Sequence, residues 1–255
     1  MRISMSELAD IQLKYGFDSD AILMMRKTFD ECAAVEDQYA MARKIMITSF
    51  QVGNSNFQSE FSDRALDRDN KRSSVETGLL QILNAHSYGR IDLKLMARKF
   101  ANMQIVGLQA LPELNGILTQ EELAFYIVLS SLACLTRSEL RESVITNSTI
   151  LSLLETVPET NEILDNFMMG RYEAFCRQMN QIQSKLKYDP CFGEHRSNTV
   201  FKKIRALTLE QYVKPYKVID MREISSAFGL PLETIEVELT ELITSGQIKA
   251  KIDSY

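Results

Sequence analysis

Apolar residues near the end of the chain first recur at helical spacing and then alternate with polar ones. A helix is predicted by apolar positions three and four residues apart: Val200, Phe201, Ile204 and Leu207. Pro215 is expected to stop this helix just after Tyr212. The segment that follows, Lys217–Ile219, is predicted to be short and extended.

Two further helices and a second extended segment complete this C-terminal pattern. Asp220 and Glu223 have the spacing of a capping box, so a helix is predicted from Asp220 to Gly229. Pro231 suits the first turn of the next helix. That helix has one apolar stripe: Leu232, Ile235, Leu239, Leu242 and Ile243. The final run, Gln247–Ile252, alternates at period two, as expected of a half-buried strand. The order helix, strand, helix, helix, strand is that of a winged helix.

Glycines punctuate the first two-thirds of the chain at a regular interval. Gly16, Gly53 and Gly89 are spaced by 37 and 36 residues, and a similar break recurs at Gly170. Each glycine is expected to end the first helix of a pair and let the chain turn. This period is typical of two-helix repeats of the tetratricopeptide (TPR) kind.

Capping signals and apolar runs support a helical interpretation. Three pairs have capping-box spacing: Ser4 with Glu7, Thr119 with Glu122, and Thr136 with Glu139. The stretch Leu123–Leu135 is nearly all apolar but too short to span a bilayer, so it predicts a buried helix. The polar stretch Asn54–Val75 predicts one short helix followed by an exposed loop.

Taken together, these patterns predict a mainly α-helical protein with two parts. Residues 1–197 are expected to form TPR-like helical hairpin repeats, a right-handed α-solenoid. Residues 198–255 are expected to form the winged-helix subdomain.

The third helix of the predicted winged helix is acidic. Leu230–Gly246 contains no Lys or Arg but has these glutamates: Glu233, Glu236, Glu238 and Glu241. In a DNA-binding winged helix this helix enters the major groove, where Lys and Arg neutralise phosphates. The net charge of −5 adds to the repulsion. We therefore expect protein partners in place of DNA, and a solvated face for most of these glutamates.

Basic residues elsewhere do not form a continuous stripe. They gather in two clusters, each better interpreted as a solvated face: Arg64, Arg68, Lys71 and Arg72; and Lys202, Lys203 and Arg205. A nucleic-acid-binding adaptor therefore remains only an alternative.

Composition is that of an ordinary globular protein, with 45% hydrophobic and 25% charged residues. The cysteines are scattered without CxxC spacing: Cys32, Cys134, Cys176 and Cys191. Neither a disulfide framework nor a zinc site is predicted. We expect buried, reduced thiols in a protein of the cytoplasm and nucleus.

Little in the sequence indicates catalysis. His86 and His195 are the only histidines, so no HxH or HxxxH metal pair is present, and no phosphate-binding glycine loop occurs. Cys191 and His195 are close enough in sequence to suggest a Cys–His pair, but a histidine in a surface loop is the better interpretation. We predict no enzyme, and no catalytic, cofactor-binding or metal-binding residue.

An ordered set of short motifs runs through the chain. They are Glu121–Tyr126, Leu132-Ala133, Arg137–Leu140, Val144-Ile145, Gly170–Tyr172, Gln211-Tyr212, Pro215-Tyr216, Ala227-Phe228, Glu238-Leu239, Gly246 and Lys251–Ser254. This set resembles the PCI-domain family, named for the proteasome lid, the signalosome and a translation initiation factor. The segment Gln211–Tyr216 favours the signalosome members, and the paralogous lid members, which share the closing Lys-Ile-Asp, are the alternative.

The resemblance implies a non-catalytic scaffold subunit of the COP signalosome, the complex that removes Nedd8 from the cullins of ubiquitin ligases. Catalysis would belong to a separate metalloprotease subunit. The implied partners are other PCI-domain subunits and the metalloprotease subunit, with cullin-RING ligases reached indirectly and neither DNA nor membrane bound. Family members have a longer N-terminal region, a second wing strand and a helical tail, so the wing is expected to be incomplete here.

Assembly is expected to use the exposed edge of the winged helix, because an unpaired strand can add to a strand of another protein. The interface hypothesis comprises Gln247, Ile248, Lys249, Ala250, Lys251 and Ile252. Lys249 and Lys251 would lie on its exposed face. The helical repeats would offer a second, concave surface.

Overall fold

A computed structural model describes residues 2–66, 74–103, 117–189 and 191–253. The described part is mainly α-helical, as predicted. Its first half comprises α1 (Arg2–Lys14), α2 (Asp18–Asp30), α3 (Val35–Val52), α4 (Ser55–Leu66), α5 (Ser74–Ser87), the short η1 (Tyr88–Arg90) and α6 (Leu93–Ala101). Its second half comprises α7 (Gln120–Cys134), α8 (Arg137–Leu140), the π-helical η4 (Arg141–Ile145), α9 (Ser148–Thr156), α10 (Pro158–Met169), α11 (Tyr172–Lys185), η5 (Leu186–Tyr188), α12 (Gly193–Val213), α13 (Met221–Phe228) and α14 (Leu232–Thr244).

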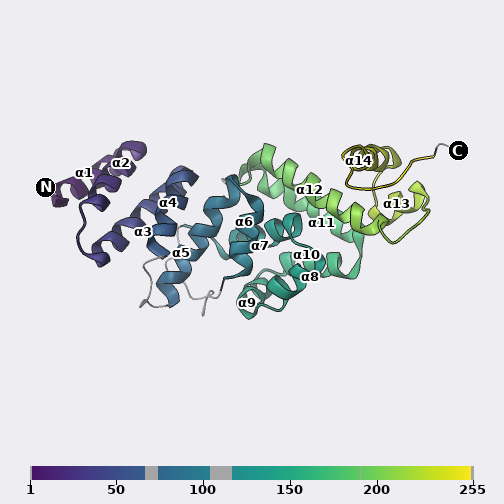
Figure 1. The fold of residues 1–255 in the computed structure, drawn as a ribbon, viewed down its shortest axis with the longest axis horizontal. Coiled ribbons are helices and arrows are strands. Elements are labelled where there is room, and N and C mark those ends of the chain that lie inside the picture. The colour runs from purple at the N-terminus through teal and green to yellow at the C-terminus, as the bar shows by residue number, and fades with distance from the viewer. Residues whose placement is uncertain (1, 67–73, 104–116, 190, 254–255) are drawn as a thin grey trace.

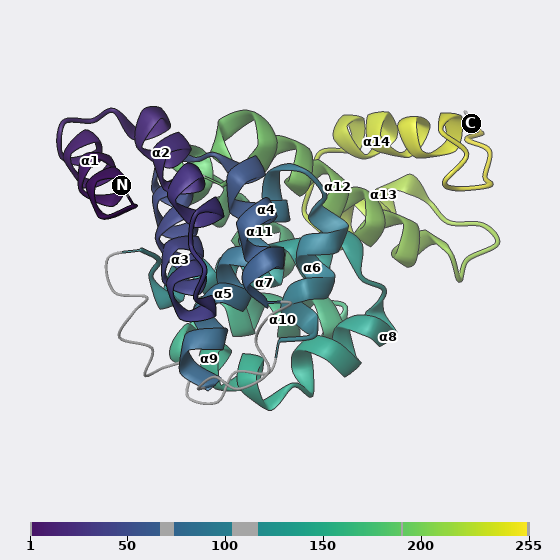
Figure 2. The same cartoon turned by 60° about the vertical axis from the view of Figure 1, so that its left-hand side comes forward.

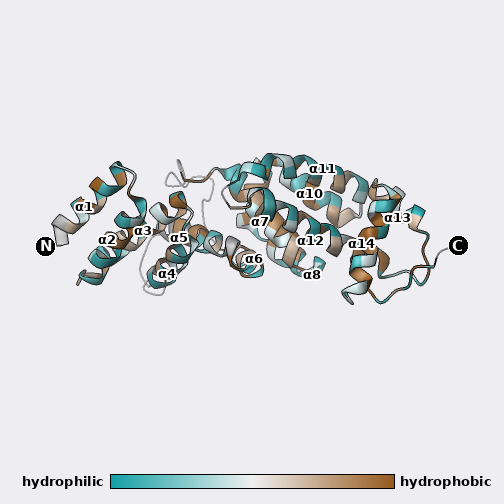
Figure 3. Ribbon diagram, turned by 90° about the horizontal axis from the view of Figure 1, so that it is seen from above, coloured by the Kyte–Doolittle hydropathy of each residue, from teal (hydrophilic) through white to brown (hydrophobic). Residues whose placement is uncertain are grey.

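The helices stack along one long axis, with the two termini at opposite ends (Figure 1). From α1 to α7, each helix packs against the next along the chain, apart from extra contacts such as α3 with α5. Apolar and polar residues alternate around most helices, so that each has a side to bury (Figure 3). None of the helices in the described ranges is long and apolar enough to cross a membrane.

Glycines end the first helix of successive pairs, as the spacing predicts. Gly16, Gly53 and Gly170 follow α1, α3 and α10 with φ between 71° and 79°, a conformation that favours glycine. Gly89 ends α5 in a different way, inside the 3-10 turn η1. A Cβ on Gly89 would stand 2.8 Å from the Cys191 sulfur, so glycine is needed there for close approach.

Two of the three predicted capping boxes form. Thr119 with Glu122 caps α7, and Thr136 with Glu139 caps α8. The box predicted at Ser4 was wrong, because α1 already includes Arg2 and Ser4 therefore lies within the helix. Spacing alone cannot show that a helix starts a few residues earlier.

The apolar run predicted to be a buried helix is α7. Every residue from Leu123 to Ala133 is buried, which makes α7 the centre of the core. It packs against α6, α9, α10 and α12. The short helix predicted within Asn54–Val75 is α4, and most of the loop predicted after it lies outside the described residues.

The strands predicted at Lys217–Ile219 and Gln247–Ile252 are wrong for the described chain, because both segments are irregular. A strand needs a neighbouring strand to bond its amides and carbonyls, and neither segment has one among the residues described. The alternation is kept only in part: Ile248 and Ile252 are half-buried and the two lysines between them are exposed, but Ala250, which should face inward, is exposed too.

The C-terminal module is built from the end of α12 together with α13 and α14. Asp220 caps α13 by accepting the amide of Arg222 (2.8 Å), and Gly229 ends it at φ +62°. The helices α13 and α14 lie one beside the other at the far end of the molecule (Figure 2). The domain boundary predicted at residues 197/198 falls inside α12 and stays a prediction.

Candidate protein-interaction surface

The predicted interface segment, Gln247–Ile252, leaves α14 through a turn at the end of the molecule. The amides of Gln247 and Ile248 both donate to the carbonyl of Leu242, at 3.0 and 3.1 Å. Ile248 and Ile252 pack against the core, and the three residues between them are exposed. The segment is therefore fixed to the helices by two apolar side chains and projects its middle outward.

The backbone in the middle of this segment is open. Within the described ranges, no backbone hydrogen bond reaches the amides from Lys249 to Ile252. Exposed amides of this kind are satisfied by water and can be taken over by a strand of another chain. In the described residues, the segment is thus held by Ile248 and Ile252, and the amides from Lys249 to Ile252 have no backbone partner.

A second exposed segment lies at the same end of the molecule and was not predicted to be part of an interface. The loop between α12 and α13 projects at the same end as the C-terminal segment (Figures 1 and 2). Its Val218 side chain is 90% exposed and Tyr216 is 50% exposed. The sequence does hold a signal for this exposure. In an extended segment neighbouring side chains point to opposite sides, so a half-buried Ile219 places Val218 on the outer side.

These two segments carry most of the basic charge of the C-terminal module. The exposed cations are Lys214, Lys217, Arg222, Lys249 and Lys251. Of the neighbouring anions, Asp220 caps α13, Asp253 pairs with Lys251 at 3.4 Å, and Glu223 is exposed in the first turn of α13, which leaves the cations in excess. The end of the module is therefore basic although the whole chain is acidic, which favours a partner segment with acidic side chains.

The acidic helix α14 is held on α12 by two ion pairs. Lys202 reaches Glu241 at 2.6 Å, and Arg205 pairs with Glu238, whose side chain is only 11% exposed. The prediction of solvated faces holds for Lys202 and Glu241, which stay exposed, and was wrong for Glu238, which is nearly buried against Arg205, 33 positions away in sequence. Glu233 and Glu236 do remain exposed.

The cysteines are free thiols, as predicted. Cys176 is buried near the Arg205–Glu238 pair, and burial raises the pKa of its thiol to about 11, with Arg205 opposing and Glu238 adding to the shift. The thiol is therefore protonated at neutral pH and packs as a small apolar group.

An aromatic cluster joins the C-terminal module to the helical repeats. The ring of Tyr172, at the start of α11, stacks on Phe228 of α13 with centroids 5.1 Å apart. Tyr212 of α12 meets both rings edge-on, each at 5.4 Å. Arg137 of α8 donates to the Tyr172 hydroxyl (3.2 Å) and to the carbonyl of Phe167 (2.6 Å).

Motifs that are far apart in sequence therefore meet at one junction. Arg137–Leu140, Gly170–Tyr172, Gln211-Tyr212 and Ala227-Phe228 each supply one of its side chains. Aromatic pairs of this kind stabilise beyond the area they bury and fix orientation. The motif residues thus set the angle at which the C-terminal module leaves the repeats.

Polar residues elsewhere are used for packing. His86 is buried, with its ring centroid 4.5 Å from that of Phe50 and 5.3 Å from that of Tyr126. The Tyr126 hydroxyl donates to Asp189 (2.8 Å), and burial, followed by Asp189, raises the tyrosine pKa.

The two residues considered as a Cys–His pair differ in their exposure to solvent. Cys191 is buried, whereas His195 is exposed on α12. Across the described residues, no group of three or more His, Cys, Asp or Glu side chains is arranged to hold a metal ion.

Comparison with known proteins identifies this C-terminal region. Residues 172–255 match the PCI domain family. The matched region begins at Tyr172 and therefore includes α11, the three aromatic rings of the junction cluster and the interface segment.

The whole chain is similar to subunits of two complexes. It is 26% identical over 260 residues to the COP9 signalosome complex subunit 1 of Arabidopsis thaliana, covering 100% of this chain and 57% of that protein. It is 26% identical over 262 residues to subunit 1b of Drosophila melanogaster, covering 98% and 48%. It is 22% identical over 258 residues to the 26S proteasome non-ATPase regulatory subunit 6 of Dictyostelium discoideum, covering 96% and 63%. The chain thus spans roughly half the length of these relatives.

Proposed function

We propose that this chain is a non-catalytic scaffold subunit of a signalosome-type complex, joined to other PCI-domain subunits through Gln247–Ile252. Support comes from its PCI domain and from its similarity along the whole chain to signalosome subunit 1 of two organisms. In this proposal the complex deneddylates cullin-RING ubiquitin ligases in the cytoplasm and nucleus, and a metalloprotease subunit performs the reaction.

The open edge of the PCI domain is the observation that carries the proposal. Ile248 and Ile252 fix the segment to the helices, while the amides between them have no backbone partner in the described ranges. Strand addition needs this combination of fixed register and free donors. The basic side chains of Lys249 and Lys251 would favour an acidic partner strand over a basic one.

The charge of α14 argues against the nucleic-acid alternative. Glu233 and Glu236 are exposed on the helix that would face DNA, and the basic side chains of α12 nearest to it are used to hold α14. A proteasome-lid subunit keeps more support, because a 26S proteasome regulatory subunit also aligns with 96% of the chain and residues 251–253 resemble the closing Lys-Ile-Asp of the lid members.

A proline at position 249 tests the strand-addition proposal. Lys249→Pro removes one amide donor from the edge, which the described chain itself does not use. We expect co-purification of other PCI subunits with the tagged variant to fall about tenfold, as for loss of one to two hydrogen bonds, while the helical circular dichroism is unchanged.

Lys249→Ala is the matched control, since it removes the charge and keeps the amide. It is expected to co-purify nearly as much partner as the native chain. Undiminished partner recovery by Lys249→Pro with native helicity would contradict strand addition at this segment, but would leave the PCI-domain assignment in place.

A further inference from the structure

A small group of exposed cations lies where α6 and α12 flank the end of α7. Both helices pack against α7, in the middle of the molecule (Figures 1 and 3). Lys203 of α12 is exposed and donates from its Nζ atom to the sulfur of Cys134, the last residue of α7, at 3.5 Å. Lys94 and Arg98 are exposed on α6, about one turn apart. These three cations, Lys94, Arg98 and Lys203, are called the basic patch.

The charges of the basic patch act on the same neighbouring groups. Burial raises the pKa of the Cys134 thiol, and the charges of Lys203 and Lys94 oppose this increase. Hydrogen bonds from the residue that caps α8 lower the pKa of Glu139, and the charges of Arg98 and Lys94 lower it further. Lys94 therefore acts on both groups and links the cation of α12 to the second cation of α6.

The basic patch is not neutralised by the fold. Its cations form no ion pair with any residue of the described ranges, whereas their neighbours in sequence do. Lys99 pairs with Asp63 at 3.6 Å. Lys202 pairs with Glu241 at 2.6 Å. Like charges one turn apart weakly destabilise a helix, so the pair of cations on α6 is unfavourable in the free chain and becomes favourable when an anionic group binds.

Two carboxylates beside the basic patch are already used as helix caps. Asp92 accepts the amides of Lys94 and Leu95 at the start of α6, at 2.9 and 3.1 Å. Glu139 accepts the amide and the hydroxyl of Thr136, both at 2.8 Å. The donors that they accept partly offset their negative charge. Three cations also outnumber them, so the surface as a whole attracts anions.

The surroundings of the basic patch favour a protein segment as the anion. Ile91, three positions before Lys94, is 57% exposed and offers an apolar contact. A nucleic acid fits less well, because its continuous row of phosphates would also meet the carboxylates of Asp92 and Glu139. Acidic side chains of a protein can be placed singly, at the cations alone.

We propose that an acidic segment of a partner protein docks on the basic patch, with its carboxylates at Lys94, Arg98 and Lys203 and an apolar side chain at Ile91. The contact is small, so its affinity depends strongly on charge. Docking there needs no strand addition at Gln247–Ile252, which lies at one end of the molecule (Figure 1).

Fluorescence anisotropy of a labelled peptide, made of glutamates with one central leucine, tests this docking with the purified chain. The native chain is expected to bind the peptide at low salt and to bind it more weakly as the salt concentration rises. Lys94→Glu with Arg98→Glu should weaken binding about tenfold or more. Lys94→Gln with Arg98→Gln should weaken it by a smaller factor, and the helical circular dichroism of both variants should be unchanged.

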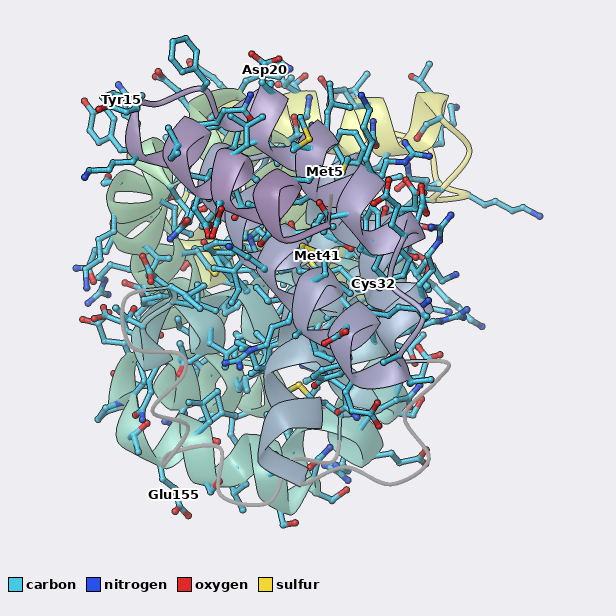
Figure 4. The ribbon with its side chains drawn as sticks, turned by 90° about the vertical axis from the view of Figure 1, so that its left-hand side faces the viewer. Met5, Tyr15, Asp20, Cys32, Met41 and Glu155 are labelled. Atoms are coloured by element: carbon cyan, nitrogen blue, oxygen red, sulfur yellow. The ribbon has the colours of Figure 1, made fainter. Side chains whose placement is uncertain are left out.

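A matched control separates the basic patch from the net charge of the chain. Lys14→Glu with Lys27→Glu makes the same change in net charge on α1 and α2, which lie at the end of the molecule that faces the viewer in Figure 4. This variant should bind the peptide like the native chain.

Cys134 reports where the peptide binds. Its thiol is half-buried next to Lys203, whereas the other three cysteines are buried, so a maleimide should label Cys134 first. Bound peptide should slow this labelling, as measured by mass spectrometry of the digested protein.

Four outcomes would overturn the proposal. The first three are no peptide binding at low salt, equal binding by the Lys94→Glu, Arg98→Glu variant and the control, and peptide binding that leaves the labelling of Cys134 unchanged. The fourth is a single-stranded DNA of equal charge that binds as tightly as the peptide and loses affinity in the same variant, because the basic patch would then be a general anion site.

Discussion

Gly229 ends α13 in the left-handed conformation, and it also allows α13 to approach α11. A Cβ at this position would lie 2.7 Å from Cγ of Glu173. The sequence predicted the first role, because glycine after an amphipathic run is a typical helix end. It could not predict the second, which depends on a residue more than fifty positions away.

Substitution of Gly229 by alanine tests both roles. Gly229→Ala combines the strain of a positive φ with the new contact, so we expect a loss of about 2–3 kcal/mol in the free energy of unfolding. Gly193→Ala is the matched control, because Gly193 has φ +59° and nothing within 4 Å of its Cβ position. It should cost only about 1 kcal/mol in urea denaturation. Equal losses in the two variants would contradict the tight approach to Glu173.

Residue-level expectations succeeded where the cause was local. The capping boxes at Thr119 and Thr136 depend on residues three positions apart, so spacing was enough to find them. The Arg205–Glu238 pair joins two helices that are distant in sequence. Neither residue has a partner within its own helix pattern, so the sequence predicts that both are solvated.

At the scale of elements, α12 holds α13 and α14 in place. Its Tyr212 packs against Phe228 in the junction cluster. Its Lys202 and Arg205, which lie about one helical turn apart, form the ion pairs with α14. Helical periodicity predicted α12, α13 and α14, since each has a clear apolar stripe and a stop signal. The predicted strands failed because strand formation depends on a partner that periodicity does not reveal.

The two ion pairs between α12 and α14 should differ strongly in their contribution to stability. Arg205→Met leaves Glu238 nearly buried without its partner, which should cost about 3 kcal/mol of unfolding free energy. Lys202→Met breaks a pair whose side chains are half exposed, so the loss should stay under about 1 kcal/mol. Urea denaturation of both variants at neutral pH measures this. A loss for Lys202→Met equal to that for Arg205→Met would contradict the importance of burial.

At the scale of the whole molecule, the segment Gln247–Ile252 lies at the end of the long axis opposite to α1 (Figure 1). Stacked helical repeats make such separation possible, because each hairpin contacts mainly its neighbours. The glycine period predicted this architecture, whereas the convergence of the PCI motifs at Tyr172 and Phe228 needed the structure.

Affinity purification of the tagged protein from its own cells, followed by mass spectrometry of what accompanies it, tests the central claim most directly. The account predicts the other PCI-domain subunits and the metalloprotease subunit of a signalosome-type complex, with cullins in smaller amounts. Recovery of proteasome lid and base subunits in their place, or of the chain without any PCI-domain partner, would contradict it.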